Sequence, residues 1–200
     1  MSENYDFHRL GSRRRQRRDE REWETLVAAL AETEGIRTLL DLPCGTGRFT
    51  GRLARRGYEV VAGDISMEMM RVARSKSNGE RGVAGYAQAD AEALPFRDDS
   101  LDCVVCARFL FHVDAPTRVE LLREMARVSR RWLIVDYRHR YTVDYLVWRL
   151  KRLVGLTREP LDRVTRKQLE EEFRNAGISL LRVLSVTPVF SDKWIVIGET

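Results

Sequence analysis

The feature that most constrains this chain is an apolar run that leads through an acidic residue into a glycine-containing turn. Residues 36–42 are mainly apolar and include Asp41, and Pro-Cys-Gly-Thr-Gly follows them. This order predicts a buried strand over 36–42, a tight turn and a helix over 48–56. Gly45 and Gly47 carry no Cβ, so the turn allows the backbone to approach a ligand closely. A glycine pair is also found in ordinary strand-to-helix turns, so other residues must decide between a binding loop and a plain turn.

The chain beyond this turn alternates between strand and helix patterns. Further strands are predicted over 58–63, 83–89, 101–107 and 132–137, and helices over 67–76 and 115–128. Strict alternation predicts an α/β fold, a doubly wound parallel sheet with right-handed crossovers and helices on both faces. The end of the chain departs from alternation. It has an amphipathic stretch over 141–154, a helix over 166–176 and a terminal strand hairpin over 178–188 and 193–198.

We expect a single domain over residues 1–200, which is enough chain for a sizeable core. Its N-terminal segment, 1–34, includes a predicted helix over 19–34. The apolar face of that helix has three- and four-residue spacing and comprises Trp23, Leu26, Val27 and Leu30. Residues 139–164 form an insertion beyond the fifth strand, where a substrate lid would lie.

The net charge of +5 is concentrated in two basic blocks, one over 13–21 and one at Arg149, Lys151 and Arg152. Each block is either a solvated helix face or a contact for an anionic partner, and the second block allows contact with a membrane surface. Acidic residues nearly balance the basic ones, which weakens the case for a nucleic-acid partner. The sequence shows neither a spanning segment nor a signal peptide, so we expect a cytoplasmic protein.

Two cysteines, Cys103 and Cys106, have the spacing of a metal or redox pair. They lie inside the apolar strand predicted over 101–107, in which residues three apart point to opposite faces. Buried free thiols are therefore expected, and no metal site is predicted.

The predicted sheet gathers polar residues at one edge. Asp64 follows the second strand, Asp90 follows the third, and residues 108–112 follow the fourth. In such sheets ligands bind at the carboxyl ends of the strands. A carboxylate after the second strand can accept hydrogen bonds from both hydroxyls of a ribose, which predicts an adenosine-containing ligand.

The glycine pattern narrows the choice of ligand. A nucleotide-triphosphate loop requires a Gly-Lys-Ser/Thr ending that is missing here, and the third glycine of a dinucleotide fingerprint comes one residue late, at Gly51. Asp41 would repel a phosphate but attract a cationic amino or sulfonium group. The loop therefore favours a cationic ligand over a pyrophosphate.

Four segments in order resemble the motifs of the class I S-adenosylmethionine-dependent methyltransferases. These are residues 41–47 (DLPCGTG), 63–70 (GDISMEMM), 88–96 (QADAEALPF) and 107–113 (ARFLFHV). The resemblance runs from about residue 39 to residue 199. It implies a mostly parallel seven-stranded sheet with an antiparallel last strand, a helical insertion after the fifth strand, and S-adenosylmethionine as cofactor.

The resemblance also implies a set of cofactor-binding residues: Asp41, Cys44, Gly45, Gly47, Asp64, Ile65, Met69, Asp90, Ala91 and Arg108. Gly45 and Gly47 would lie against the methionine part, with Asp41 nearby. Asp64 would bind the ribose, and Ile65 and Met69 would flank the adenine unless they are plain core residues. Asp90 and the Ala91 backbone would bind the adenine amino edge, and the Arg108 carbonyl would hold the methionine amino group.

Methyl transfer is an in-line displacement, so a base is needed only when the acceptor must lose a proton. His112 and His139 are the first candidates for a catalytic base, and His8 and Tyr137 are the second. His112 is alternatively a residue that shapes the acceptor pocket. The candidate acceptor-binding residues are Phe109, Phe111, His112, Tyr141, Tyr145 and Trp148.

Tyr141, Tyr145 and Trp148 favour an aromatic or apolar acceptor unless they are plain core residues, and a small-molecule acceptor is the leading hypothesis. Two alternatives stay open: an RNA or protein methyltransferase, and a partner protein that binds the cofactor without catalysis. The first alternative is weakened because the sequence has neither an added recognition domain nor an Asn-Pro-Pro-Tyr-like motif after the fourth strand. The sequence does not predict the acceptor atom or the oligomeric state.

Overall fold

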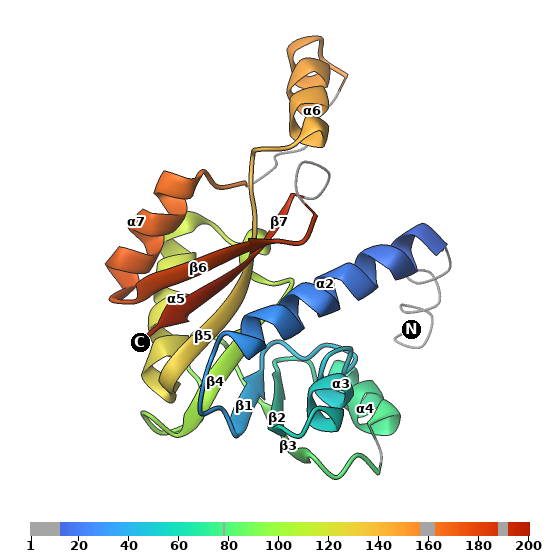
Figure 1. Ribbon diagram of the computed structural model, residues 1–200, viewed down its shortest axis with the longest axis vertical. Helices are drawn as coiled ribbons and strands as arrows, with labels where there is room; N and C mark the ends of the chain where they lie inside the picture. The colour runs from blue at the N-terminus through green and yellow to red at the C-terminus, as the bar shows by residue number, and fades with distance from the viewer. Residues whose placement is uncertain (1–12, 78, 157–162, 188–191) are drawn as a thin grey trace.

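A computed structural model describes residues 13–77, 79–156, 163–187 and 192–200. Seven strands form one sheet in the order β3-β2-β1-β4-β5-β7-β6 (Figure 1). Their bounds are β1 Thr38–Asp41, β2 Glu59–Asp64, β3 Val83–Gln88, β4 Leu101–Cys106, β5 Ser129–Arg138, β6 Ser179–Ser185 and β7 Lys193–Glu199. The pairs from β3 to β5 are parallel, whereas β7 is antiparallel to both β5 and β6. This topology confirms the predicted fold.

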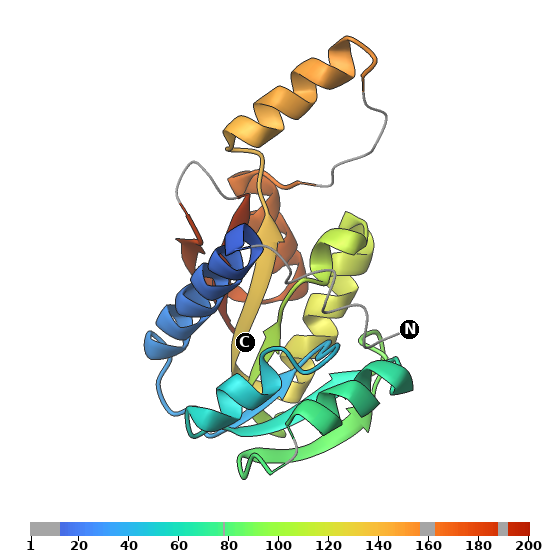
Figure 2. The same cartoon turned by 90° about the vertical axis from the view of Figure 1, so that its right-hand side faces the viewer.

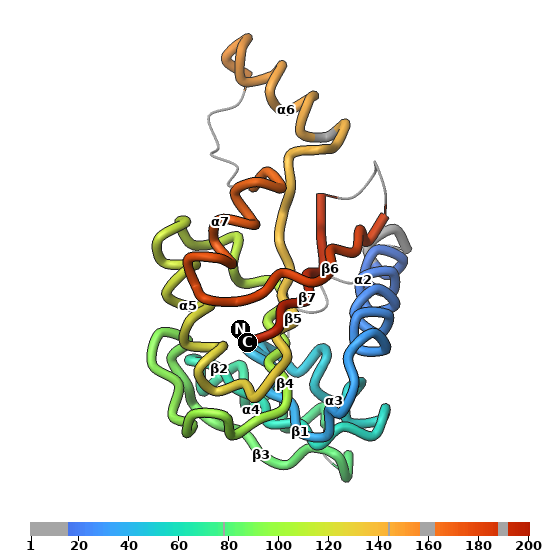
Figure 3. Tube along the Cα trace, turned by 60° about the vertical axis from the view of Figure 1, so that its left-hand side comes forward, coloured from blue at the N-terminus to red at the C-terminus, as the bar shows by residue number. Residues whose placement is uncertain are grey.

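Helices cover both faces of the sheet (Figure 3). Their bounds are α2 Arg13–Ala31, α3 Thr50–Arg55, α4 Met67–Lys76, α5 Ala115–Val128, α6 Val143–Leu153 and α7 Arg166–Ala176. Apolar side chains of α5 and α7 pack on one face, and those of α2, α3 and α4 pack on the other. Cys106 belongs to the first core and Cys103 to the second. Both are buried free thiols, as predicted from their spacing.

Local signals explain where several helices begin and end. The Ser66 hydroxyl accepts a hydrogen bond from the Met69 N–H at 3.3 Å and caps α4. Thr165 and Gln168 form a reciprocal capping box at the start of α7, and Gly177 ends this helix in the left-handed region. These helices have the predicted bounds.

Other boundaries differ from the prediction. The first helix begins at Arg13 and ends at Ala31, not over 19–34. Strand β1 begins only at Thr38, and α3 begins at Thr50 because the preceding residues form the glycine loop. Strand β5 begins at Ser129, three residues earlier than predicted. Part of the predicted insertion, 157–162, and part of the hairpin, 188–191, lie outside the described residues.

Helix α6 stands apart from the rest of the fold (Figure 2). It follows β5 directly, and a bridge between His139 and Val164 joins the two ends of the insertion. The Thr142 hydroxyl accepts a hydrogen bond from the Tyr145 N–H at 3.2 Å and caps the helix. Among the described residues, no helix combines the length and the apolar character needed to cross a membrane.

Candidate functional site: a pocket at the carboxyl ends of the parallel strands

A pocket of about 650 Å³ opens at the carboxyl ends of β1, β2 and β4. This is the place expected from the reversal of strand order between β1 and β4, and the size suits a small organic ligand. The predicted cofactor residues that line it are Cys44, Gly45, Gly47, Asp64, Ile65, Met69 and Arg108. Phe109 and His112 line it from the segment after β4.

The two glycines of the loop serve different purposes. Gly45 and Gly47 have φ values of 53° and 75°, in the region that favours glycine. A Cβ on Gly47 would lie 2.9 Å from the Cα and Cβ of Ala73, so this glycine allows the loop to pack on α4. A Cβ on Gly45 would meet nothing within 4 Å. Gly45 lines the pocket, and its missing side chain leaves that space for a ligand.

Asp64 connects the glycine loop to the start of α4. One carboxylate oxygen accepts a hydrogen bond from the Gly45 N–H at 2.8 Å, and the other accepts one from the Ser66 N–H at 2.8 Å. Each oxygen keeps further acceptor capacity, as recognition of a ribose diol requires. Next to it, Ile65 is 63% exposed and lines the pocket. An apolar side chain this exposed is not a core residue, which favours the ligand-contacting alternative.

Asp41 lies beneath the loop and does not line the pocket. It is buried, and its carboxylate accepts a hydrogen bond from the Thr50 hydroxyl at 2.6 Å. Burial raises the pKa of Asp41 to about 7, and the negative charge of Asp64 adds to this rise. Burial therefore shifts Asp41 toward its protonated form.

Arg108 holds an unusual backbone conformation at the pocket wall. Its φ is 64°, which is uncommon for a residue with a side chain. Its N–H donates to a carboxylate oxygen of Asp136 at 2.7 Å, and its guanidinium Nε donates to Glu22 on α2 at 2.9 Å. These bonds fix the backbone whose carbonyl was predicted to hold a ligand amino group.

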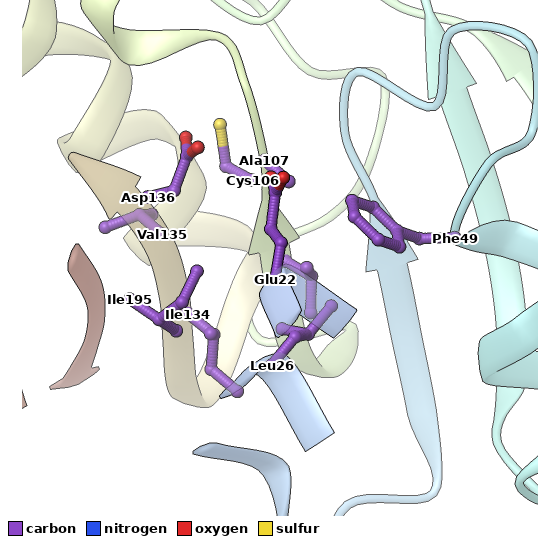
Figure 4. Close-up of a pocket in the computed structure, with 10 residues that line it drawn as sticks. Glu22, Leu26, Phe49, Cys106, Ala107, Ile134, Val135, Asp136 and Ile195 are labelled. Carbon is purple, nitrogen blue, oxygen red and sulfur yellow. The ribbon is translucent and has the colours of Figure 1, made fainter. Parts of the chain in front are cut away.

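Arg108 belongs to a buried ion cluster that sequence reasoning missed. The Lys193 ammonium lies 2.7 Å from a Glu22 oxygen and 3.0 Å from an Asp136 oxygen. Glu22 and Asp136 line a hollow of about 10 Å³, which is too small for a cofactor. Figure 4 shows these two side chains among the residues that line it. Burial raises the pKa of Glu22, but the hydrogen bond from Arg108 and the charge of Lys193 outweigh it and lower the pKa to about 2.

A sequence signal for this cluster does exist. Glu22 shares a helix face with Leu26 and Ala29, both of which are buried. A carboxylate at a core position of an amphipathic helix predicts a buried cationic partner. The sequence does not identify that partner, because Arg108 and Lys193 are 86 and 171 residues away.

The structure does not bring all predicted cofactor residues to the pocket. Asp90 is exposed, and its carboxylate accepts a hydrogen bond from the Glu92 N–H at 3.0 Å. Ala91 is buried in the core on the side of α5. Neither residue lines the pocket described above.

Several predicted catalytic and acceptor residues also lie elsewhere. His139 is buried and stacks on Trp194, with 4.3 Å between ring centroids. The Phe111 ring lies under the Arg138 guanidinium at 4.0 Å, and Tyr141 is largely exposed. Tyr145 and Trp148 line a separate hollow on α6. Of the two candidate bases, only His112 reaches the pocket.

Residues 40–132 match the model of a methyltransferase domain. This segment contains the glycine loop, Asp64, Arg108 and His112, so the matched residues include most of those that line the pocket. Residues 40–132 are therefore similar to a methyltransferase domain, and they make up just under half of the chain. The methyltransferase model ends within β5, and α6 lies outside it.

Curated relatives align with part of this chain over part of their own length. The ubiquinone/menaquinone biosynthesis C-methyltransferase UbiE of Pasteurella multocida is 35% identical over an alignment of 125 residues that covers 58% of this chain and 46% of that protein. The protein of the same name from Pectobacterium carotovorum is 37% identical over an alignment of 117 residues that covers 53% of this chain and 46% of that protein. The chain thus spans about half the length of these relatives.

Solved structures share the methyltransferase fold. Magnesium protoporphyrin IX methyltransferase of Synechocystis, crystallised with bound SAH, has a TM-score of 0.72 at 22% identity and covers 90% of this chain and 83% of its own. The PH0226 protein of Pyrococcus horikoshii has a TM-score of 0.70 at 20% identity. The match covers 95% of this chain and 93% of that protein's chain. At these identities the likeness establishes the fold.

Proposed function

We propose that this chain binds S-adenosylmethionine in the 650 Å³ pocket and transfers its methyl group to a small-molecule acceptor. The observation that carries the proposal is the open space over Gly45 beside the Asp64 carboxylate. Together they offer a close backbone approach for one part of the cofactor and two acceptor oxygens for its ribose.

In this proposal, different residues contact different parts of the cofactor. Asp64 accepts the ribose hydroxyls, Ile65 and Met69 flank the adenine, and the loop with Gly45 and Gly47 contacts the methionine part. Arg108 offers its backbone carbonyl to the methionine amino group, near Asp41 and Cys44. Asp90 and Ala91 are proposed for the adenine amino edge, from positions outside the pocket lining.

S-adenosylmethionine supplies a methyl group already activated on a sulfonium sulfur. The chain therefore has to orient the two reactants and exclude water, which contributes up to about 7–11 kcal/mol in favourable cases. Phe109 and His112 line the pocket beside the glycine loop, and we propose that they contact the acceptor. His112 is the candidate base where the acceptor must lose a proton.

Names of the relatives support a small-molecule acceptor. The curated relatives are named for quinone biosynthesis, and one solved structure is named for a porphyrin. The cytoplasm is the proposed location, and the buried free thiols fit its reducing conditions. Because Tyr141, Tyr145 and Trp148 do not reach the pocket, we assign them no acceptor contact.

The test is incubation with methyl-labelled S-adenosylmethionine and fractionated cell extract, followed by mass spectrometry of the labelled products. We expect the label in a low-mass compound, and its loss in Asp64→Ala. Label in RNA or protein would support the alternative methyltransferase classes. Tight cofactor binding with no labelled product in any fraction would support a non-catalytic cofactor-binding protein.

A further inference from the structure

Helix α6 turns its apolar face to solvent. Val143, Leu146, Val147 and Leu150 recur at three- and four-residue spacing, and Leu153 continues the series. The exposed fractions of Leu146, Leu150 and Leu153 are 56%, 56% and 77%. These side chains form one continuous apolar surface on an element that projects from the fold (Figure 2). We call this surface the apolar face of α6.

The opposite side of α6 carries aromatic side chains that contact one another and nearby arginines. Tyr145 and Trp148 stack at 5.5 Å between ring centroids. The Arg163 guanidinium lies 5.5 Å from the Tyr145 ring centroid, and the Arg152 guanidinium lies 5.3 Å from that of Trp148. Arg163 is buried, so its contact holds the Tyr145 ring against the rest of the chain. These contacts set the rotation of the helix and leave the apolar face outward.

The charges around the apolar face are basic. With a period of about 3.6 residues, Arg149 and Lys151 flank it on its two sides, and both are exposed. Asp144, in the first turn, is the one acidic residue in the sequence of α6. A second copy of the helix would bring these cationic side chains together, whereas an anionic surface would attract all of them.

We propose that α6 docks on an anionic lipid bilayer, with its apolar face at the boundary between headgroups and acyl chains. Exposed leucines and valines enter the apolar layer, and Arg149 and Lys151 reach lipid phosphates while their stems cover apolar surface. This inference goes beyond the proposed function, because lipid binding is measured without methyl transfer.

The test is co-sedimentation of the full chain with vesicles of phosphatidylcholine alone or mixed with phosphatidylglycerol. We expect binding to the mixed vesicles and much weaker binding to phosphatidylcholine alone. Leu150→Gln combined with Leu153→Gln should reduce binding at least tenfold, since two apolar side chains leave the bilayer. Leu181→Gln is the matched control, because Leu181 is exposed on β6.

A second pair of variants tests the charges. Arg149→Gln and Lys151→Gln should each weaken binding to the mixed vesicles about fivefold, and less so at high salt. Arg71→Gln and Arg74→Gln remove the same charge from exposed positions on α4 and should leave binding unchanged. Equal binding to both vesicle types, unchanged binding in the α6 variants, or no binding by the wild type would overturn the proposal. Dimerisation that is lost in the leucine variants would make a second copy the occupant instead and overturn it too.

Discussion

Helices α2 and α6 have the same kind of sequence pattern but opposite environments. Both lie outside the strand–helix alternation, and both repeat apolar residues at three- and four-residue spacing. In α2 the repeat is buried, with Leu26 only 2% exposed, whereas in α6 Leu150 is 56% exposed. An amphipathic pattern therefore predicts that a face will be covered, but it does not identify what covers it.

The difference follows from what the rest of the fold provides. Helix α2 covers the face of the sheet that carries Leu39, Cys103 and Ile134, and its Glu22 meets Arg108 and Lys193 there. The opposite face is covered by α5 and α7. Other helices thus cover both faces of the sheet, and α6 projects beyond it (Figure 1).

The largest expected effect is on the ion cluster that holds α2. Glu22→Ala leaves the buried Lys193 and the half-buried Arg108 without this carboxylate, and we expect a loss of about 3–5 kcal/mol in the free energy of unfolding. Denaturant unfolding measures it. Glu20→Ala, at an exposed ion pair with Arg52, is the control and should cost less than about 1 kcal/mol. Equal losses would show that the cluster does not hold α2.

The apolar face of α2 should contribute nearly as much. Leu26→Ala opens a cavity against the sheet and should lower the free energy of unfolding by about 2–5 kcal/mol. Denaturant midpoints at an unchanged m-value would measure this loss. A change below about 0.5 kcal/mol would contradict the packing of α2 described above.

Acid should weaken the attachment of α2. The pKa of Glu22 is about 2 in the folded chain against a usual 4.5, so its ionised form stabilises the fold above pH 4.5. That contribution, on the order of 3 kcal/mol, is lost as the pH falls from 4.5 through about 2. Unfolding measured across this range should show a smaller loss for Glu22→Gln than for the wild type. The same acid dependence in both proteins would assign it to other carboxyls.

The smallest effect is expected on α6. Leu150→Ala removes an exposed side chain, and the free energy of unfolding should stay within about 0.5 kcal/mol of the wild type. The same substitution that is costly at Leu26 is thus nearly neutral at Leu150. A loss of several kcal/mol would show that α6 packs on the domain in solution.

Sequence reasoning succeeded where the determinants are local. The cap at Ser66, the capping box at Thr165 and the left-handed Gly177 set helix ends within a few residues of chain. Asp64 and Gly45 lie at the predicted edge because parallel strands end there together. The three-residue spacing of Cys103 and Cys106 within a strand also predicted correctly that they point to opposite faces of the sheet.

It failed where distant segments meet. The contact of Glu22 with Lys193 joins residues 171 positions apart and depends on how α2 crosses the sheet. Tyr145 and Trp148 were predicted near the acceptor because the insertion follows β5, but the direction of α6 depends on which surfaces are already covered. His139 was predicted as a possible base at the start of the insertion, and it packs under Trp194 instead of lining the pocket.

We propose that the methyl donor binds at the glycine loop and Asp64, and that α6 takes no part in binding it. Titration calorimetry with S-adenosylmethionine tests this most directly, on the wild type, Asp64→Ala and Leu150→Ala. We predict that Asp64→Ala weakens binding by about 1.5–3 kcal/mol, because it removes hydrogen bonds to a charged group, and that Leu150→Ala binds like the wild type. Unchanged affinity in Asp64→Ala, with the variant folded by circular dichroism, would contradict the account.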